Sequence, residues 1–477
     1  MTRSVLIAML LALPAAAAAK DPQPPHSLSF EKLWTHGHTT PGQVSEIPAF
    51  DPRTNTIWVA GVVGVDVLDG RTGALVEHID VTPYGFVNSV AIHNGLAAFA
   101  IEAGAPDRRA PGVVVFYRTS TRLRVGDPVT VGSLPDMLTF THDGSKLLVA
   151  NEATPNVMAD ATYTTPDPAG TVSIIDVETR TVIATAGFDN VPRFGTNLRT
   201  NVGMDFEPEY IAVDHDDSRA FVTLQEANAI AVLDLSSNAF TEIIGLGAKD
   251  FSLPENQFDP RNDGTIQFIT ANAKALYMPD GVASYRWHGG TFLVLANEGD
   301  FREDNVDRAT AGNAPYLAPA PLDRLRISNR DSSPGNLYAA GARSMSIRDA
   351  QGTIVYDSGG ILDTEAAARG VYDDGRSRDK GVEPEGVALL DVAGRTYAFV
   401  GLERTTSSAV AVFDITNPYE AEFLDLIVTP GDLSPEGLAA FAYRGECYLA
   451  IANEVPAPGA TTTSTTLYRV NKGKPRD

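Results

Sequence analysis

Two segments near the C-terminal end of the chain each carry a pair of glutamates at the same spacing. In "VEPEGVALLDVAGRTYAFVGLERT" the pair is Glu385 and Glu403, and in "LSPEGLAAFAYRGECYLAIANEV" it is Glu436 and Glu454, 18 residues apart in both cases. Each pair brackets two alternating apolar runs, a pattern that predicts a β-hairpin. The start of the first strand and the end of the second lie at the same end of a hairpin. We therefore expect the two carboxylates of each pair to converge.

The same acidic positions recur along the rest of the chain. A first series, acidic except for one Asn, stands at the start of the predicted hairpins: Glu46, Asn88, Asp136, Glu209, Asp280, Glu385 and Glu436. A second series ends the second strands, often within "ANE" or a relative of it: Glu102, Glu152, Glu226, Glu298, Glu403 and Glu454. Carboxylates that lie this close raise one another's pKa unless something neutralises them, and oxygen-rich clusters suit hard cations.

The meeting point of the two series is therefore predicted to be a site for Ca²⁺, or for another divalent cation such as Mg²⁺. The expected ligands are Glu209, Asp280, Glu298, Asp300, Glu385, Glu403, Glu436 and Glu454. The alternative is a polar, water-filled funnel that holds no metal.

The elements that position these acids are predicted to be strands throughout. Alternating runs such as "TVSIIDV", "AIAVLDL" and "AVAVFDI" are separated by turn residues, and helical periodicity is nearly absent. Seven units repeat at a pitch of about 40 to 50 residues with four short strands each, which is typical of a β-propeller. The first strand of each propeller blade lines the central channel, so the acids should gather at one channel mouth.

The seventh unit runs out of chain before a fourth strand. The segment "LSFEKLW", residues 28–34, is a strand-like run that no unit uses. We expect it to form the outermost strand of the last blade, which removes an exposed sheet edge. The predicted fold is all-β, a seven-bladed β-propeller with four-stranded antiparallel blades that is closed by an N-terminal strand.

The chain begins with "MTRSVLIAMLLALPAAAAAK", and residues 1–19 have the pattern of a secretory signal peptide. Its apolar run is too short to span a bilayer, so we expect no membrane anchor and an exported, periplasmic or extracellular protein. Residues 20–477 are predicted to form a single propeller domain. The only cysteine is Cys447, which leaves no partner for an internal disulfide.

Two long insertions interrupt the strand pattern, at about residues 299–340 and 361–382. Loops of this length are uncommon in compact domains unless they form a lid or a binding loop. Both leave from the carboxylate end and mix acids with cations, including Arg302 and Lys380. A solvated loop without a function is the alternative.

The net charge of −23 argues against nucleic acid and anionic membranes as partners. The chain has no HExxH, GxSxG, P-loop or paired CxxC motif, and no visible Ser-His-Asp constellation. Catalysis would therefore use water activated by a metal ion. The candidate catalytic residues are Glu385 and Glu403, with Arg404 and either Lys380 or Arg302 from the insertions as phosphate clamps. For Arg404, a salt bridge to the neighbouring acids is an equal alternative.

Several segments resemble the choice-of-anchor I family. They are "ANEGD", "DKGVEPEGVALLDVAGRTYAFVGLERT", "VFDITNP", "DLSPEGLAAF" and "IANEV". That family includes mesenchyme-specific cell-surface glycoproteins and bacterial proteins labelled as alkaline phosphatases. The resemblance implies a secreted seven-bladed propeller and phosphatase-like activity. A looser similarity links the "PEG" and "NE" pattern to phytase-like propellers, whose channel acids hold Ca²⁺ beside phosphate.

These observations predict a secreted, metal-dependent hydrolase of phosphoric esters that acts on a small phosphorylated substrate at the carboxylate-lined channel mouth. The main alternative is a non-catalytic, cation-stabilised propeller that binds a ligand or a cell-surface partner. A third hypothesis is that the protein catalyses another hydrolase reaction or acts as a lactonase. We expect the protein to be a monomer.

Overall fold

The structure is a computed structural model, and it describes residues 26–104, 108–154, 168–200, 206–301 and 307–475. The predicted signal peptide, residues 1–19, and Arg302 of the first insertion lie outside the described residues. In the part of the chain that the structure describes, no helix has the length and apolar character needed to cross a bilayer.

The described chain is all-β and is dominated by seven sheets of four or five strands, which are antiparallel except for one parallel edge strand in the fourth sheet. The first sheet contains β2 (Pro48–Asp51), β3 (Thr56–Gly61), β4 (Gly64–Asp69) and β5 (Leu75–Asp80). The second contains β6 (Phe86–His93), β7 (Leu96–Glu102), β8 (Pro111–Arg118) and β10 (Val129–Ser133), with β9 (Leu123–Arg124) beside β8. The third contains β11 (Pro135–Phe140), β12 (Lys146–Asn151), β13 (Thr171–Asp176) and β14 (Thr181–Ala186).

The remaining sheets follow the same order from an inner to an outer strand. The fourth contains β16 (Pro208–Val213), β17 (Arg219–Leu224), β18 (Ala229–Asp234) and β19 (Ala239–Leu246), with β15 (Arg193–Thr196) parallel to β19. The fifth contains β22 (Val282–Trp287), β23 (Gly290–Asn297), β27 (Ser344–Asp349) and β28 (Ile354–Asp357). The sixth contains β29 (Pro384–Val392), β30 (Arg395–Leu402), β31 (Ser408–Asp414) and β32 (Glu422–Thr429). The seventh contains β33 (Leu433–Tyr443), β34 (Glu446–Val455), β35 (Ser464–Pro475) and β1 (His26–Gly37). Four strands per sheet was the expectation, and the second and fourth sheets each carry a fifth.

The prediction that the N-terminal segment forms the outermost strand of the last sheet is confirmed. β1 pairs with β35 in antiparallel register, with Leu28 opposite Lys472 and Trp34 opposite Leu467. The strand is longer than the predicted residues 28–34, and it covers the edge that β35 would otherwise expose.

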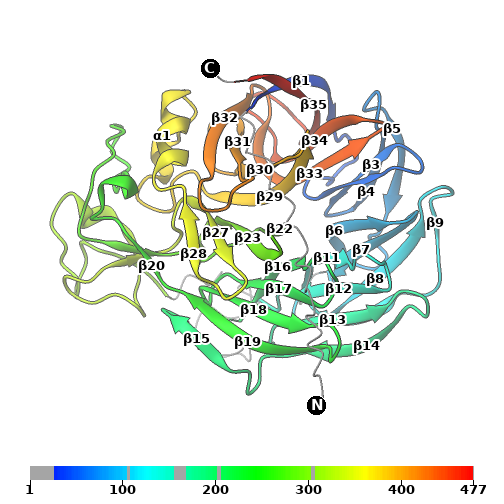
Figure 1. The fold of residues 1–477 in the computed structure, drawn as a ribbon, viewed down its shortest axis with the longest axis horizontal. Coiled ribbons are helices and arrows are strands. Elements are labelled where there is room, and N and C mark those ends of the chain that lie inside the picture. The colour runs from blue at the N-terminus through cyan, green and yellow to red at the C-terminus, as the bar shows by residue number, and fades with distance from the viewer. Residues whose placement is uncertain (1–25, 105–107, 155–167, 201–205, 302–306, 476–477) are drawn as a thin grey trace, which may run out of the picture.

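The second insertion contains α1 (Ile361–Ala368) and the 3-10 turn η3 (Asp374–Arg376). The first contains β24 (Arg308–Thr310), β25 (Arg326–Ser328), β26 (Tyr338–Ala339) and η2 (Leu322–Arg324). Residues upstream of the first insertion pack with it: β21 (Lys274–Leu276) pairs with β26 on one side and with β20 (Ala248–Asp250) on the other. The 3-10 turn η1 (Pro254–Asn256) follows β20 in the chain. Figure 1 shows the seven sheets around a common centre, with β20 and α1 projecting on one side.

Apolar side chains fill the space between each pair of successive sheets. The contact between the third and fourth sheets, for example, buries Leu148 and Ile174 against Val222 and Leu224. The seventh sheet packs on the first in the same way, with Ala450 and Leu467 against Ile57 and Val59. The inner strands also neighbour one another in chain order, and β33 neighbours β2. Strands buried on both faces explain the near-continuous apolar runs in the sequence.

Candidate functional site: a carboxylate-lined cavity

A local backbone irregularity aims the leading acids toward the centre of the molecule. Five of these acids directly follow a proline: Asp136, Glu209, Asp280, Glu385 and Glu436. In four of the five hairpins, all except that of Asp280, the strand register breaks just after this proline. A β-bulge re-aims a side chain, and proline is tolerated at a strand start because it donates no ladder hydrogen bond.

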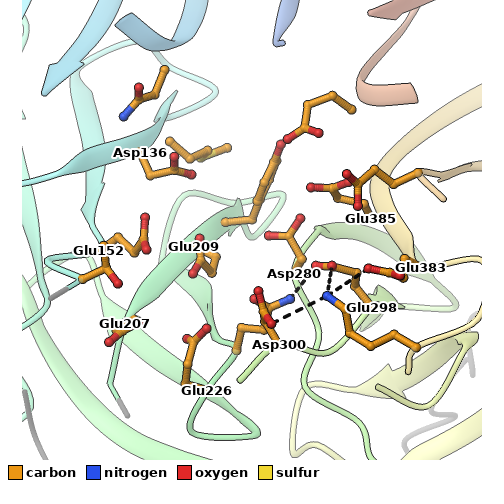
Figure 2. A pocket seen from close by; sticks show the side chains of 18 of the residues that line it. Asp136, Glu152, Glu207, Glu209, Glu226, Asp280, Glu298, Asp300, Glu383 and Glu385 are labelled. Carbon is orange, nitrogen blue, oxygen red and sulfur yellow. Dashed lines mark hydrogen bonds and ion pairs between the residues drawn. The ribbon is translucent and has the colours of Figure 1, made fainter. Parts of the chain in front are cut away.

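The acids of the two series, except Glu102, converge on one cavity of about 580 Å³. Its acidic lining residues are Glu46, Asp136, Glu152, Glu207, Glu209, Glu226, Asp280, Glu298, Asp300, Glu383, Glu385, Glu403, Glu436 and Glu454. Its basic lining residues are Arg108, Arg308, Arg376, Lys380 and Arg404. Acids therefore outnumber bases by far, and Figure 2 shows many of these carboxylates pointing toward one another.

All eight residues predicted as metal ligands line this cavity, and five of them fall into close groups. Three groups of three carboxylates have ligand oxygens within 4.8 Å of one another, and we call them the carboxylate triads. They are Asp280, Glu298 and Glu385; Glu298, Glu383 and Glu403; and Glu385, Glu403 and Glu436. Glu209, Asp300 and Glu454 line the cavity but belong to no triad.

Burial and mutual repulsion favour the protonated form of these acids. Burial and the nearby Glu454 raise the pKa of Glu436 to about 8, although a hydrogen bond with Glu385 opposes the rise. Burial, followed by Glu403 and Glu436, raises the pKa of Glu385 well above its ordinary value. The pKa of Asp136 rises to about 6 because of burial and Glu102. In the absence of a cation, part of the cluster therefore holds protons at neutral pH.

Lys380 lies inside the cluster rather than at its rim. Its Nζ is 2.6 Å from Glu298 Oε1, 3.0 Å from Glu383 Oε2 and 3.7 Å from Asp300 Oδ1, and its side chain is only 6% exposed. Burial lowers its pKa, but the three carboxylates outweigh that effect and the pKa ends well above its usual range. The ammonium group therefore occupies the second triad as a fixed cation. It is not placed as a free phosphate clamp.

Arg404 forms the salt bridge that was the alternative to a clamp. Its Nη2 is 2.7 Å from Glu403 Oε1, and its Nε is 3.9 Å from Glu383 Oε2. The side chain is 42% exposed, so part of the guanidinium still faces solvent at the cavity. A guanidinium has five N–H donors, and one carboxylate leaves several of them available.

The sequence analysis missed the residues that tie the insertion to the cavity. Glu383 is 1% exposed, accepts a hydrogen bond from Arg376 Nε at 2.6 Å, and binds Lys380. Gln225 Nε2 donates to Glu298 Oε2 at 2.8 Å. A signal for Glu383 was present, since "EPE" occurs at residues 207–209 and again at 383–385. Nothing in the sequence indicated that Arg376 would reach it.

Comparison with protein families gives one match, to the choice-of-anchor I domain, over residues 46–418. No curated protein sequence matches the chain.

Solved structures show a similar fold at low sequence identity. A chain of the Kuenenia stuttgartiensis hydrazine synthase is 11% identical with a TM-score of 0.50, covering 87% of this chain and 94% of that one. A chain in the crystal structure of a mitotic checkpoint complex is 11% identical with a TM-score of 0.52, covering 98% of this chain and 99% of that one. At this identity the likenesses show the fold alone, which is all-β and propeller-like.

Proposed function

Because the chain belongs to the choice-of-anchor I domain family, we propose that it is an exported, cation-binding β-propeller that hydrolyses phosphoric esters. The cation is Ca²⁺ or another hard divalent ion such as Mg²⁺. The observation that carries this proposal is the convergence of three carboxylate triads in one cavity.

The proposed architecture is a closed propeller of seven blades. Its support is the continuous sequence of apolar contacts between neighbouring sheets, including the contact of the seventh sheet with the first. Phe50 of β2 stacks on Phe441 of β33 with ring centroids 3.9 Å apart, which fastens that junction. The cavity then lies at one mouth of the central channel. We further propose that the protein acts as a monomer in the periplasm or outside the cell.

The donor atoms suit a hard cation. Lys380 already neutralises the second triad, so the first and third triads remain, and both contain Glu385. Oε2 of Glu385 is buried and has no hydrogen-bond partner among the residues that the structure describes. A buried polar atom without a partner costs about 1–3 kcal/mol, and a bound cation would remove that cost. Cation binding would also displace the protons that these acids hold.

In the proposed hydrolysis of a phosphoric ester, the residues around Glu385 have different roles. A divalent cation, when bound, polarises phosphoryl oxygens and acidifies a coordinated water. Glu403 or Glu385 would be the group that takes a proton from the attacking water, since both carboxylates lie inside the triads. Arg404 directs its remaining N–H groups at an anionic oxygen. Lys380 is a positioning residue that holds Glu298 and Glu383 in place.

The test combines elemental analysis with a phosphoester panel. Protein purified without chelator is assayed with p-nitrophenyl phosphate, bis-p-nitrophenyl phosphate and phytate in added Ca²⁺ or Mg²⁺. Hydrolysis should require the cation and should fall at least about a hundredfold in Glu385→Gln, the range that loss of a general base gives. Glu178→Gln, an exposed residue far from the cavity lining, is the matched control. Turnover that survives chelator or the Glu385 substitution would assign the activity to a contaminant.

The second candidate is a non-catalytic propeller that the cation stabilises and that binds a ligand or a surface partner. The position of Lys380 favours it, because the ammonium group is fully engaged by carboxylates and cannot also hold a phosphate. Metal-loaded protein that hydrolyses none of the three esters would select this candidate.

A further inference from the structure

A second cluster of metal-ligating side chains lies where the closing strand meets the first sheet. It consists of His36 on β1, His38 just after β1, Asp66 on β4 and His78 on β5. None of the four lines the carboxylate cavity. Ligand atoms of His36, His38 and Asp66 lie within 4.8 Å of one another.

Backbone register brings these side chains together. His36 and His38 are two residues apart, so extended backbone points them to the same side. Asp66 and His78 are direct partners across the β4–β5 pair. Gly64 is required beside them, because a Cβ at that position would lie 2.5 Å from His78 Cε1.

Asp66 is the centre of the cluster. It is 1% exposed, and its Oδ2 and Oδ1 lie 2.7 Å from His38 Nδ1 and 2.6 Å from His78 Nδ1. His38 is 2% exposed, and its other nitrogen, Nε2, lies 2.8 Å from Thr465 Oγ1 on β35. A histidine held in this way by an outer hydroxyl has its ring orientation fixed, as is usual for metal-ligating histidines.

His36 is the residue that this hydrogen-bonded network leaves unexplained. Its Nε2 is buried and has no hydrogen-bond partner among the described residues. Its ring centroid is 5.0 Å from that of His38.

We propose that His36, His38 and Asp66 form a structural site for a transition metal of the Zn²⁺ class, and that His78 orients Asp66 through its other carboxylate oxygen. Imidazole nitrogens with one carboxylate suit such metals, whereas the all-carboxylate cavity suits Ca²⁺ or Mg²⁺. Binding replaces the proton between His38 Nδ1 and Asp66 Oδ2 by the metal. The two atoms then separate to roughly 3.3 Å, the tetrahedral spacing for bonds of 2.0–2.1 Å.

The position of this site indicates which parts of the fold a bound metal would hold together. His36 lies on the outermost strand of the seventh sheet and His38 directly follows that strand, whereas Asp66 and His78 belong to the first sheet. The metal would therefore fasten the N-terminal strand to the start of the first sheet. The chain has one cysteine, so no internal disulfide can fasten this junction instead.

The experiment uses the full chain, stripped with a chelator and then saturated with Ca²⁺ to fill the carboxylate cavity. Zn²⁺ or Co²⁺ is titrated by calorimetry, and the Co²⁺ form is followed by its visible absorption. We expect one equivalent per chain, a visible spectrum of a four-coordinate Co²⁺ site, and a higher melting temperature with Zn²⁺. His36→Gln should weaken Zn²⁺ binding by at least about tenfold and abolish the Zn²⁺-dependent rise in melting temperature.

The variants are chosen so that folding and binding are separable. His36→Gln loses no hydrogen bond of Nε2, whereas substitution of His38 would break contacts to Asp66 and Thr465. His288→Gln is the matched control. His288 is exposed in the turn between β22 and β23 of the fifth sheet, and it is therefore distant from the cluster. Failure of the wild-type protein to bind Zn²⁺ or Co²⁺ would overturn the proposal. Equal affinity and an equal Co²⁺ spectrum in His36→Gln would also overturn it, because the metal would then lie elsewhere.

Discussion

The two sides of the carboxylate cavity differ in how closely their acids approach one another. On the side nearest the insertions, all three triads are drawn from Asp280, Glu298, Glu383, Glu385, Glu403 and Glu436. On the opposite side lie Asp136, Glu152, Glu209 and Glu226, and no triad among the described residues includes any of them. Figure 2 shows Glu298, Glu383 and Glu385 on one side, and Asp136, Glu152 and Glu209 on the other.

Counter-charges from the second insertion account for this difference. Lys380 and Arg376, both in that insertion, contact Glu383, and Lys380 also contacts Glu298. On the opposite side, Arg108 is the basic residue in the cavity lining, and it pairs with Glu102 at 2.9 Å. Repeated hairpins therefore supply carboxylates on all sides, but close packing occurs where an inserted segment supplies a buried cation. This distinction predicts where a divalent ion binds, and it can be tested on each side separately.

The largest effect should come from removing the buried cation. Lys380→Met leaves Glu298 and Glu383 without their ammonium partner in a buried position. Removing one partner of a buried ion pair typically costs about 3–5 kcal/mol, because the remaining charge is uncompensated. Urea unfolding at neutral pH in chelator should show this loss. Lys32→Met, at an exposed position of β1, should leave the unfolding midpoint unchanged.

The same variant also tests the link to metal binding. Loss of Lys380 vacates the second triad, so Ca²⁺ should restore more stability to Lys380→Met than it adds to the wild type. An unfolding midpoint that does not move in chelator would mean that the insertion does not hold the triads together.

The second prediction compares one glutamate from each side. Glu385 belongs to two triads and Glu209 to none. A ligand that binds only the folded state stabilises it by about 2.7 kcal/mol at a hundredfold excess over Kd. Glu385→Gln should remove most of the rise in melting temperature that Ca²⁺ causes, and Glu209→Gln should retain most of it. If the two variants lose the Ca²⁺-induced rise in melting temperature equally, the ion binds between the two sides of the cavity, and the proposed difference between the sides is wrong.

The sequence predicted the parts of this arrangement that repeat. Alternating runs gave the hairpins, and the acids at their ends gave seven of the eight cavity residues that were named as ligands; the eighth, Asp300, lies in the first insertion. The closing strand followed from a missing fourth strand. These features are local, or they follow from a symmetry that the chain shows several times.

The features that sequence analysis missed occur once and depend on contacts between distant segments. Lys380 and Glu298 are 82 residues apart, and no periodicity relates them. Strand β15, residues 193–196 "RFGT", is short, lacks alternation and pairs in parallel beyond β19. β21 pairs with β26 across more than 60 residues and carries β20 on its other side. Such contacts arise from tertiary packing, which overrides weak local preference.

The third prediction uses the different pKa values on the two sides. Glu436, on the insertion side, holds its proton up to about pH 8, whereas the unfolded chain releases it near 4.5. The folded state therefore binds the extra proton between these values, and stability falls as the pH rises through this window. Asp136, on the opposite side, has a folded pKa of about 6. Above pH 6 it has lost its proton in the folded state as well, so it no longer contributes to the change of stability with pH.

Chelator-treated protein should accordingly lose on the order of 1 kcal/mol of stability for each proton between about pH 6.5 and 7.5. Glu436→Gln should flatten this slope, and Asp136→Asn should not. Saturating Ca²⁺ should also flatten it, because the bound cation has already displaced the protons. Urea unfolding at several pH values is the measurement. A slope that depends on Asp136 instead would reverse the assignment of the two sides.

The smallest effect on stability is expected from two of the four arginines that line the cavity, Arg404 and Arg108. Arg404 pairs with Glu403 at 2.7 Å and Arg108 with Glu102 at 2.9 Å, and their side chains are 42% and 39% exposed. The arginine of each pair is partly exposed whereas its carboxylate partner is nearly buried, so Arg404→Ala and Arg108→Ala should each cost less stability than Lys380→Met, in which both sides of the pair are buried. Their effects on function should differ, because only Arg404 adjoins a triad residue. We expect Arg404→Ala to raise KM for phosphoesters and Arg108→Ala to leave it unchanged. If the two variants change KM equally, the anion is attracted by the general field of the cavity, and Arg404 has no specific contact with it.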